Sequence, residues 1–196
     1  MKVLRDPTGP LGVNTYYGVC ENTGKGFLVD PGGYDHQLAE KIKEEGTTLE
    51  YIILTHGHFD HVGGVPEFMK EFPEAKLVVS RQEKEINLLP DILIEGGEVL
   101  CVGELKLEFM HTPGHSPGSL CILVEDILFS GDTLFQQSVG RTDFPGSSFA
   151  SLERSIREKL YVLPDDTNVL PGHMGETEIG FEKRNNPFVR YSADRG

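Results

Sequence analysis

Short runs of apolar residues, many of them ended by glycine, proline or aspartate, recur along the chain and predict β-strands. The runs are VNTYYGVC, GFLVD, EYIILT, KLVVS, ELKLEFM, SLCILVE, ILFSGD and TNVLPG. Between some of them, apolar residues recur at intervals of three and four, which is the period of one helix face. That pattern predicts helices near residues 34–45, 63–72, 81–88 and 148–160.

The order of these elements limits the fold. Several predicted strands follow one another without a helix between them, especially from Glu98 to Ser130. This order argues against a regular doubly wound parallel sheet, in which strands and helices alternate. We expect an α/β or α+β fold with two mixed sheets covered by helices. A chain of 196 residues is long enough for one core, so we expect a single domain over 1–196, with 186–196 as a C-terminal tail.

The composition is that of an ordinary globular protein, and its charge bears on partners. Hydrophobic residues make up 38% of the chain and charged residues 25%, unlike the composition of a disordered chain. The formal net charge of -13 opposes attraction to phosphate backbones and to anionic membrane surfaces. We therefore expect no nucleic-acid partner and no membrane partner. The oligomeric state is left open.

The first residues and the cysteines indicate a compartment. The start, MKVLRDPTGPLG, has no apolar core of signal-peptide length, and no apolar run approaches the roughly 18 residues of a membrane span. Cys20, Cys101 and Cys121 are widely spaced and odd in number. Such cysteines suit a reducing compartment better than a disulfide framework. We expect a cytoplasmic protein.

Three histidines and an aspartate crowd into THGHFDH, residues 55–61, directly after the predicted strand EYIILT. In an extended segment, His56 and His58 project to the same side because they are two residues apart. Asp60 and His61 follow where the chain turns toward a helix. A solvated polar turn is the alternative, but it rarely concentrates histidine in this way. Imidazole nitrogens and carboxylate oxygens this close together predict a metal site.

Three other predicted strands end beside an isolated histidine or aspartate. His115 lies in HTPGHSPGS after ELKLEFM, Asp132 in FSGDT after ILF, and His173 in LPGHMG after TNV. Loops at strand ends commonly form binding sites, so we expect these three to converge on one cleft with THGHFDH.

THGHFDHVGG, HTPGHSPGS, SGDTLF and LPGH, in that order, resemble the metallo-β-lactamase superfamily over essentially the whole chain. The resemblance implies a four-layer αββα sandwich with two divalent metal ions at one edge of the sheets, zinc first and iron or manganese as alternatives. Two groups of three ligands bridged by Asp132 are implied, and His58, Asp60 and Asp132 would also be catalytic. The implied groups are His56, His58 and His115 for one metal and Asp60, His61 and His173 for the other.

Within the superfamily, GDTLFQQSVGRTDFPG and LPGHMGETEIGFEKRNNPF resemble the short, single-domain bacterial branch of the type II glyoxalases, the hydroxyacylglutathione hydrolase-like proteins. This resemblance implies hydrolysis of a thioester such as S-D-lactoylglutathione or a related acyl-thiol by a hydroxide that bridges the metals. Longer glyoxalases add a C-terminal helical domain that helps to bind glutathione, and the sequence stops soon after NPF. Class B β-lactamases usually replace part of the ligand set, which disfavours a lactamase.

Two further residues are candidates for supporting the ligands. Asp30, in LVDPGG, either supports the ligand loops from behind or is a plain turn aspartate before Pro-Gly. His111 begins HTPGH, but the family pattern uses the later histidine. We therefore expect a supporting or packing role for His111.

Three cationic residues are candidates for substrate binding. Arg141, in GRTDF, either meets the substrate or pairs with Asp143. Lys183 and Arg184, in FEKRNN, either bind the carboxylates of a glutathione-like thiol or belong to an exposed helix face.

Three other functions remain as alternatives. Persulfide dioxygenases share the fold and a similar GRTDF loop but hold one iron, here through His56, His115 and Asp132. They usually have alanine where Gly172 stands. An RNA-processing nuclease is disfavoured by the acidic charge. A non-catalytic zinc-binding module would need only the four ligands of a closed structural site, fewer than are present here.

Overall fold

Two six-stranded β-sheets pack face to face in the computed structural model, which describes residues 1–84 and 86–190. The first sheet has the order β1–β2–β3–β4–β5–β6 and the second the order β14–β13–β10–β9–β8–β7. The strands of the first sheet are β1 (Lys2–Thr8), β2 (Val13–Cys20), β3 (Lys25–Val29), β4 (Thr48–Ile53), β5 (Lys76–Ser80) and β6 (Ile92–Ile94). Those of the second are β7 (Val99–Val102), β8 (Leu105–His111), β9 (Leu120–Val124), β10 (Ile127–Gly131), β13 (Asn168–Pro171) and β14 (Thr177–Glu178).

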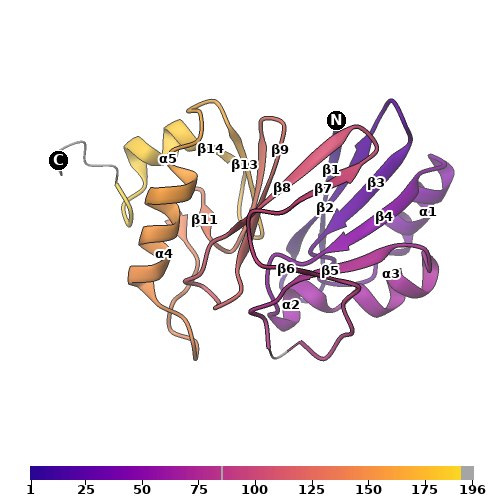
Figure 1. The fold of residues 1–196 in the computed structure, drawn as a ribbon, viewed down its shortest axis with the longest axis horizontal. Helices are drawn as coiled ribbons and strands as arrows, with labels where there is room; N and C mark the ends of the chain where they lie inside the picture. Colours follow the sequence, from indigo (N-terminus) through magenta and orange to yellow (C-terminus); the bar gives the residue numbers. More distant parts are fainter. Residues whose placement is uncertain (85, 191–196) are drawn as a thin grey trace.

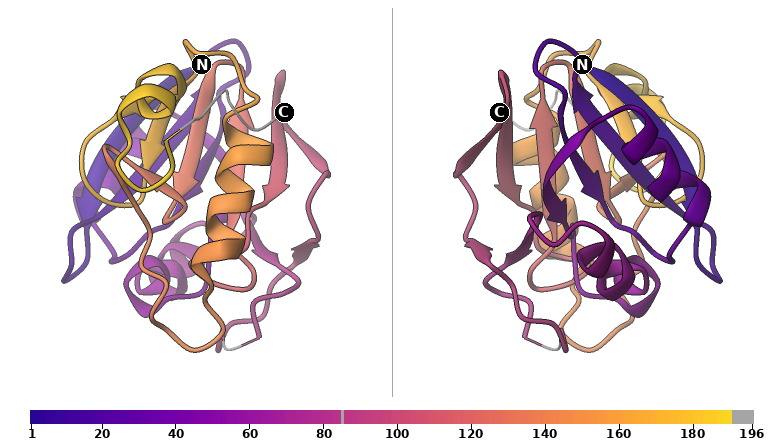
Figure 2. Two further views of the ribbon diagram at one scale, coloured as in Figure 1. Left: turned by 90° about the vertical axis from the view of Figure 1, so that its left-hand side faces the viewer. Right: turned by 90° about the vertical axis from the view of Figure 1, so that its right-hand side faces the viewer.

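Helices cover the outer face of each sheet, so the chain has the layer order αββα (Figures 1 and 2). The helices beside the first sheet are α1 (His36–Glu44), α2 (Phe59–Val62) and α3 (Val65–Glu71). Those beside the second are α4 (Phe149–Ser155), its continuation as a π-helical segment η1 (Ile156–Leu160), and α5 (Ile179–Asn185). A small hairpin of β11 (Leu134–Phe135) and β12 (Ser138–Val139) follows β10. The predicted sandwich is confirmed.

The alternation of side chains along each strand explains why both faces of both sheets are buried. On β2, Tyr16 faces the core between the sheets, whereas Tyr17 faces the helices of the first layer. On β9, Ile122 faces the same central core, whereas Cys121 faces the helices of the second. Because successive side chains point to opposite faces, strands that are apolar on both sides require a cover on both sides. Each fully buried aliphatic or aromatic side chain contributes about 1.5–3 kcal/mol to folding.

The strand directions place the ligand loops together. Strands β3, β4, β5 and β6 run parallel, and β10 runs parallel to β13. The segments that follow β4, β8, β10 and β13 therefore leave the same edge of the sandwich, and they carry the histidines and the two aspartates singled out above. Across this edge the backbone N–H of Leu120 donates to the carbonyl of Thr55 at 2.8 Å, and that of Asn14 to Gly172 at 2.8 Å.

The helix predicted over residues 81–88 is wrong, since the described residues of that span form turns and irregular backbone. Their tertiary contacts differ from those of a surface helix. Ile86 and Leu88 pack against the core between the first sheet and its helices. Glu83 hydrogen-bonds to a loop of the second sheet. The segment thus contacts two different layers of the fold. We attribute its irregular backbone to these contacts, which outweigh the local helical period.

The predicted tail also differs from the structure. Asn186 is buried and its side-chain amide donates to Ser138 and to Glu182, while Val189 is buried in the core beneath α4. Residues 186–190 are thus part of the packed domain, and 191–196 lie outside the described residues. Cys20 and Cys121 are buried thiols and Cys101 is exposed, with no disulfide among the described residues. No helix within the described ranges is long and apolar enough to cross a membrane.

Candidate metal centre

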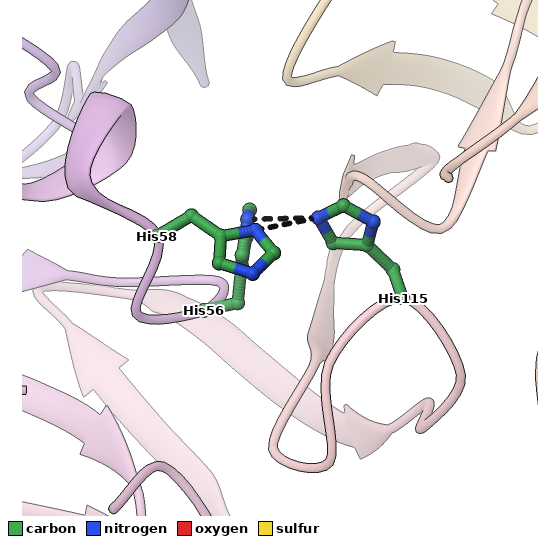
Figure 3. A group of neighbouring side chains, drawn as sticks. All are labelled: His56, His58 and His115. Carbon is green, nitrogen blue, oxygen red and sulfur yellow. Dashed lines mark hydrogen bonds between the residues drawn. The ribbon is translucent and has the colours of Figure 1, made fainter. Parts of the chain in front are cut away.

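Three imidazoles converge where the loop after β4 meets the loop after β8. The Nε2 atom of His115 lies 3.2 Å from Nε2 of His56 and 2.9 Å from Nδ1 of His58. In Figure 3, His56 and His58 extend from one loop and point toward His115 on the facing loop. Such convergence of ring nitrogens is the arrangement by which histidines hold one metal ion. We call these residues the three-histidine group.

A second group forms beside the first. Nε2 of His173 lies 3.3 Å from Oδ2 of Asp60, and Nε2 of His61 lies 3.7 Å from the same oxygen. One ligand atom from each of these residues lies within 4.8 Å of the others. We call them the Asp60–His61–His173 group.

Asp132, at the end of β10, lies between the two groups. Its Oδ1 is 3.4 Å from Nε2 of His61, and its Oδ2 is 3.5 Å from Nε2 of His115 and 3.7 Å from Nε2 of His173. All seven ligand residues predicted from the sequence therefore meet at one place. Because its oxygens lie beside ligands of both groups, the carboxylate of Asp132 is placed to be shared between two ions.

Two buried atoms test whether this donor set fits a cation. Among the described residues, Nε2 of His61 and Oδ1 of Asp132 are buried without a hydrogen-bond partner. Leaving such an atom unsatisfied costs about 1–3 kcal/mol. Both atoms can present a lone pair to the same small space. Nitrogen and oxygen donors in this arrangement fit a divalent transition-metal ion.

Asp30 holds the loop that carries these ligands. Its Oδ1 accepts the backbone N–H of Thr55 at 2.7 Å, and its Oδ2 accepts the Thr55 hydroxyl at 2.6 Å. Nδ1 of His61 lies 2.9 Å from the same Oδ2. When His61 donates there, its Nε2 is left to bind metal. Asp30 also lies near His56 and His61 as a possible ligand group, but these hydrogen bonds give it the supporting role considered from the sequence.

The GRTDF loop shapes the mouth of the site through its backbone and an aromatic ring. Nδ1 of His115 lies 2.8 Å from the carbonyl oxygen of Arg141. The guanidinium of Arg141 makes two hydrogen bonds to Asp143, at 3.0 and 2.7 Å, and lies 4.6 Å from the ring centre of Phe144. Phe144 in turn packs 4.9 Å from the ring of His58. Of the two roles considered for Arg141, the structure shows the pairing with Asp143.

Lys183 and Arg184 lie elsewhere. Both are on α5, where Nζ of Lys183 donates to Asp165 at 2.6 Å and Nη1 of Arg184 to the same carboxylate at 3.2 Å. They line a cavity together with Tyr161 and Arg190, and none of the metal-ligand residues lines it. The predicted contact with substrate carboxylates is therefore not supported by their position.

His111 anchors the ligand loop rather than binding metal. Its Nε2 donates to the carbonyl of Pro117 at 2.8 Å, which closes the loop that carries His115. This agrees with the supporting role expected from the sequence.

Burial and neighbouring carboxylates shift the pKa values of the ligands apart. Burial lowers the pKa of His61, but Asp30, Asp132 and Asp60 outweigh that effect and raise it to about 9. Burial raises the pKa of Asp132 to about 6. Burial also lowers the pKa of His115 to about 4, so this imidazole is neutral and ready to coordinate at pH 7.

Two residues have roles at the site that the sequence analysis did not predict, although Gly172 was noted there for another reason. Gly172 has no side chain because a Cβ there would lie 2.4 Å from Oδ1 of Asp132 and 2.8 Å from Cε1 of His61. Glu83 reaches the loop of His115 from the segment that was predicted to be a helix. A glycine directly before a predicted ligand was a usable signal for the first. No sequence signal pointed to Glu83, because it lies between two strands of the first sheet and its hydrogen-bond partners lie in a loop of the second sheet.

The fold and this double ligand set define a metallo-hydrolase of the αββα type. The family model described as the metallo-beta-lactamase superfamily matches residues 8–173, and the chain belongs to that superfamily.

Among curated relatives, the chain is 39% identical to the probable metallo-hydrolase YqgX of Bacillus subtilis, over 96% of this chain and 98% of that protein. It is 36% identical to the hydroxyacylglutathione hydrolase GloC of Haemophilus influenzae, over 83% of this chain and 86% of GloC.

Three solved structures share the whole fold. The B3 metallo-beta-lactamase BLEG-1 has a TM-score of 0.88 at 34% identity, covering 96% of this chain and 99% of its own. ETHE1 from Myxococcus xanthus has a TM-score of 0.86 at 29% identity, covering 96% of this chain and 84% of its own. TTHA1623, in a di-iron-bound form, has a TM-score of 0.83 at 31% identity, covering 95% of this chain and all of its own.

Proposed function

We propose that this protein is a binuclear metal-dependent hydrolase of thioesters, with S-D-lactoylglutathione or a related acyl-thiol as substrate. The observation that carries the proposal is the complete pair of ligand groups joined by Asp132. A structural zinc site needs four protein ligands and is closed by them. A set of seven, partly open to solvent, suits catalysis better than a structural role.

The residues divide the chemistry among them. Two bound divalent cations would supply Lewis acidity toward the thioester carbonyl and would lower the pKa of a water molecule toward about 7. Asp132 would hold both ions, while Asp60 and His58 would hold one each. His173 has 27% of its side chain exposed, whereas His61 is buried, so the substrate would approach from the side of His58 and His173.

The leaving group favours a thioester. A thiol has a pKa of about 8.5, so it departs as a thiolate with little help from a general acid. An amide nitrogen would need a proton donor. Phe144 offers the substrate an apolar contact beside His58. The GloC relative is named for hydrolysis of a hydroxyacyl-glutathione, which supports this substrate class.

A mononuclear iron dioxygenase, the alternative left open by the GRTDF loop, is the second candidate. His56, His115 and Asp132 meet here and would serve a two-histidine, one-carboxylate site. The complete Asp60–His61–His173 group supports the hydrolase instead, because a site with a single iron would not use these three ligands. The likeness to BLEG-1 makes β-lactam hydrolysis a third activity to test.

Metal content and activity, measured together, test the proposal. Metals are counted by mass spectrometry on protein purified without added metal. The same preparation is assayed for S-D-lactoylglutathione hydrolysis, for oxygen uptake with glutathione persulfide and for cleavage of a chromogenic cephalosporin. We expect two metals per chain and thioester hydrolysis.

Three variants sharpen the result. His58→Ala and His173→Ala should each abolish hydrolysis, whereas His36→Ala, an exposed histidine of α1, should leave it unchanged. One iron per chain, oxygen uptake and little effect of His173→Ala would establish the dioxygenase instead. Cephalosporin cleavage without thioester hydrolysis would identify a lactamase.

A further inference from the structure

The connection between β5 and β6 lies against both loops that form the three-histidine group. A Cβ at Gly57, which stands between His56 and His58, would lie 2.9 Å from Oε2 of Glu83 and 2.7 Å from Cγ1 of Ile86. A Cβ at Gly118, beyond His115, would lie 2.6 Å from Cγ of Glu83. Two glycines in two ligand loops thus leave space for the same side chain.

Hydrogen bonds fix Glu83 to the second of these loops. Its Oε1 accepts the backbone N–H of Gly118 at 3.1 Å and also the hydroxyl of Ser116, which follows His115 directly. One carboxylate oxygen of Glu83 therefore accepts hydrogen bonds from two residues of this loop. Charge-assisted hydrogen bonds of this kind are stronger than neutral ones.

The serine protons can be assigned from this geometry. Ser116 has one hydroxyl proton, and the carboxylate of Glu83 can only accept it. In the 2.9 Å contact between the hydroxyls of Ser116 and Ser119, the donor is therefore Ser119. Oγ of Ser119 in turn accepts the backbone N–H of Ser116 at 3.0 Å. The two hydrogen bonds between Ser116 and Ser119 close a ring within the loop after His115. The hydroxyl proton of Ser116 is not used in that ring and is donated to Glu83.

We propose that Glu83 is a positioning residue that fixes the loop of His115 against the loop of His56 and His58, so that the three imidazoles are held ready for a metal ion. Glu83 acts through Ser116 and Gly118 and contributes no ligand. The inference rests on the metal centre of the proposed function but on no particular substrate.

Two substitutions separate the acceptor from its charge. Glu83→Ala removes the acceptor, so the hydroxyl of Ser116 and the N–H of Gly118 lose their partner and the loop loses its anchor. Glu83→Gln keeps a carbonyl oxygen that can accept both hydrogen bonds. We expect Glu83→Gln to rescue most of what Glu83→Ala loses.

The test is a zinc titration of the metal-free, full-length protein against a chromophoric chelator. The two binding steps are assigned with His58→Ala, which removes a ligand of the three-histidine group, and with His173→Ala, which removes one from the other group. Glu83→Ala should weaken the first of these steps by about 10–100-fold, the usual effect of losing a partner that orients a ligand. The step assigned by His173→Ala should stay unchanged.

Asp91→Asn is the matched control, since Asp91 accepts the backbone N–H of Leu77 at the other end of the same connection. It should leave both zinc affinities unchanged. Normal binding by Glu83→Ala, or equal weakening of both steps, would overturn the proposal. If Glu83→Ala does not fold, Ser116→Ala removes one of the two donors and should weaken the same step. Because no substrate is present, a lack of thioester hydrolysis would refute the proposed function and leave this inference standing.

Discussion

Nδ1 of His61 lies 2.9 Å from Oδ2 of Asp30, and both side chains are almost completely buried. Asp30 has a φ of 49°, a left-handed conformation that is uncommon outside glycine. Its carboxylate also accepts two hydrogen bonds from Thr55. One residue of the loop after β3 thereby sets both the direction and the tautomer of a ligand on α2.

Asp30→Asn should therefore weaken metal binding at the Asp60–His61–His173 group by about 10–100-fold. The amide can accept at only one of its two positions, so either Thr55 or His61 faces an N–H group. If it is His61, its Nδ1 must accept and its Nε2 carries the proton, which prevents coordination. Metal content after dialysis measures the effect. Asp126→Asn, on an exposed turn, is the control, and retention of two metals by Asp30→Asn would contradict the prediction.

Gly172→Ala should lower the occupancy of the same group. The added methyl would overlap Oδ1 of Asp132 and crowd the ring of His61, so both ligands must move. We expect fewer than two metals per chain and at least roughly tenfold lower hydrolysis, as expected when the orientation of metal ligands is disturbed. Gly46→Ala is the control, since alanine is strained at a φ of +65° but its Cβ would contact no neighbour. It tests whether a loss of stability alone removes metal. Equal metal loss in both variants would disprove the steric explanation.

The stability of the metal-free protein should fall as the pH rises from 6.5 to 9. The pKa of His61 is raised from 6.5 to about 9 in the folded state. In that window the folded state binds more protons than the unfolded state, so the free energy of unfolding decreases with pH. Urea unfolding at several pH values measures the slope. Asp30→Asn, which removes a carboxylate that raises this pKa, should flatten it, and a slope of opposite sign would rule out a charged His61.

Glu182→Ala should destabilise the fold by about 3 kcal/mol, since it leaves several buried donors without an acceptor. The buried carboxylate accepts the backbone N–H of Gln137 at 3.0 Å, the hydroxyl of Thr177 at 2.6 Å and the amide of Asn186 at 2.8 Å. It thus ties α5 to the hairpin that follows Asp132. Chemical denaturation measures the loss. Glu178→Ala, an exposed neighbour, should change stability by less than about 0.5 kcal/mol, and equal effects would refute the role.

The sequence alone predicted two mixed sheets covered by helices and a shared metal site, while the division of the ligands into two groups came from the resemblance to the superfamily. Alternating apolar positions required strands with both faces covered, as Tyr16 and Tyr17 illustrate on β2. The spacing of His56 and His58, together with Asp132 and others at separate strand ends, predicted a shared metal site. Both features follow from local rules, because strand periodicity and the position of strand ends are written in short stretches of sequence.

Only the tertiary structure decided what depends on contacts between distant segments. Residues 81–88 have a helical period, yet Glu83 and Ile86 pack against loops of two sheets and the helix does not form. Lys183 and Arg184 were candidates for binding substrate carboxylates, but both pair with Asp165 and line a cavity that contains none of the metal ligands. The partners of these side chains are set by how the layers pack against one another. A local pattern of residues does not encode which distant segments come into contact.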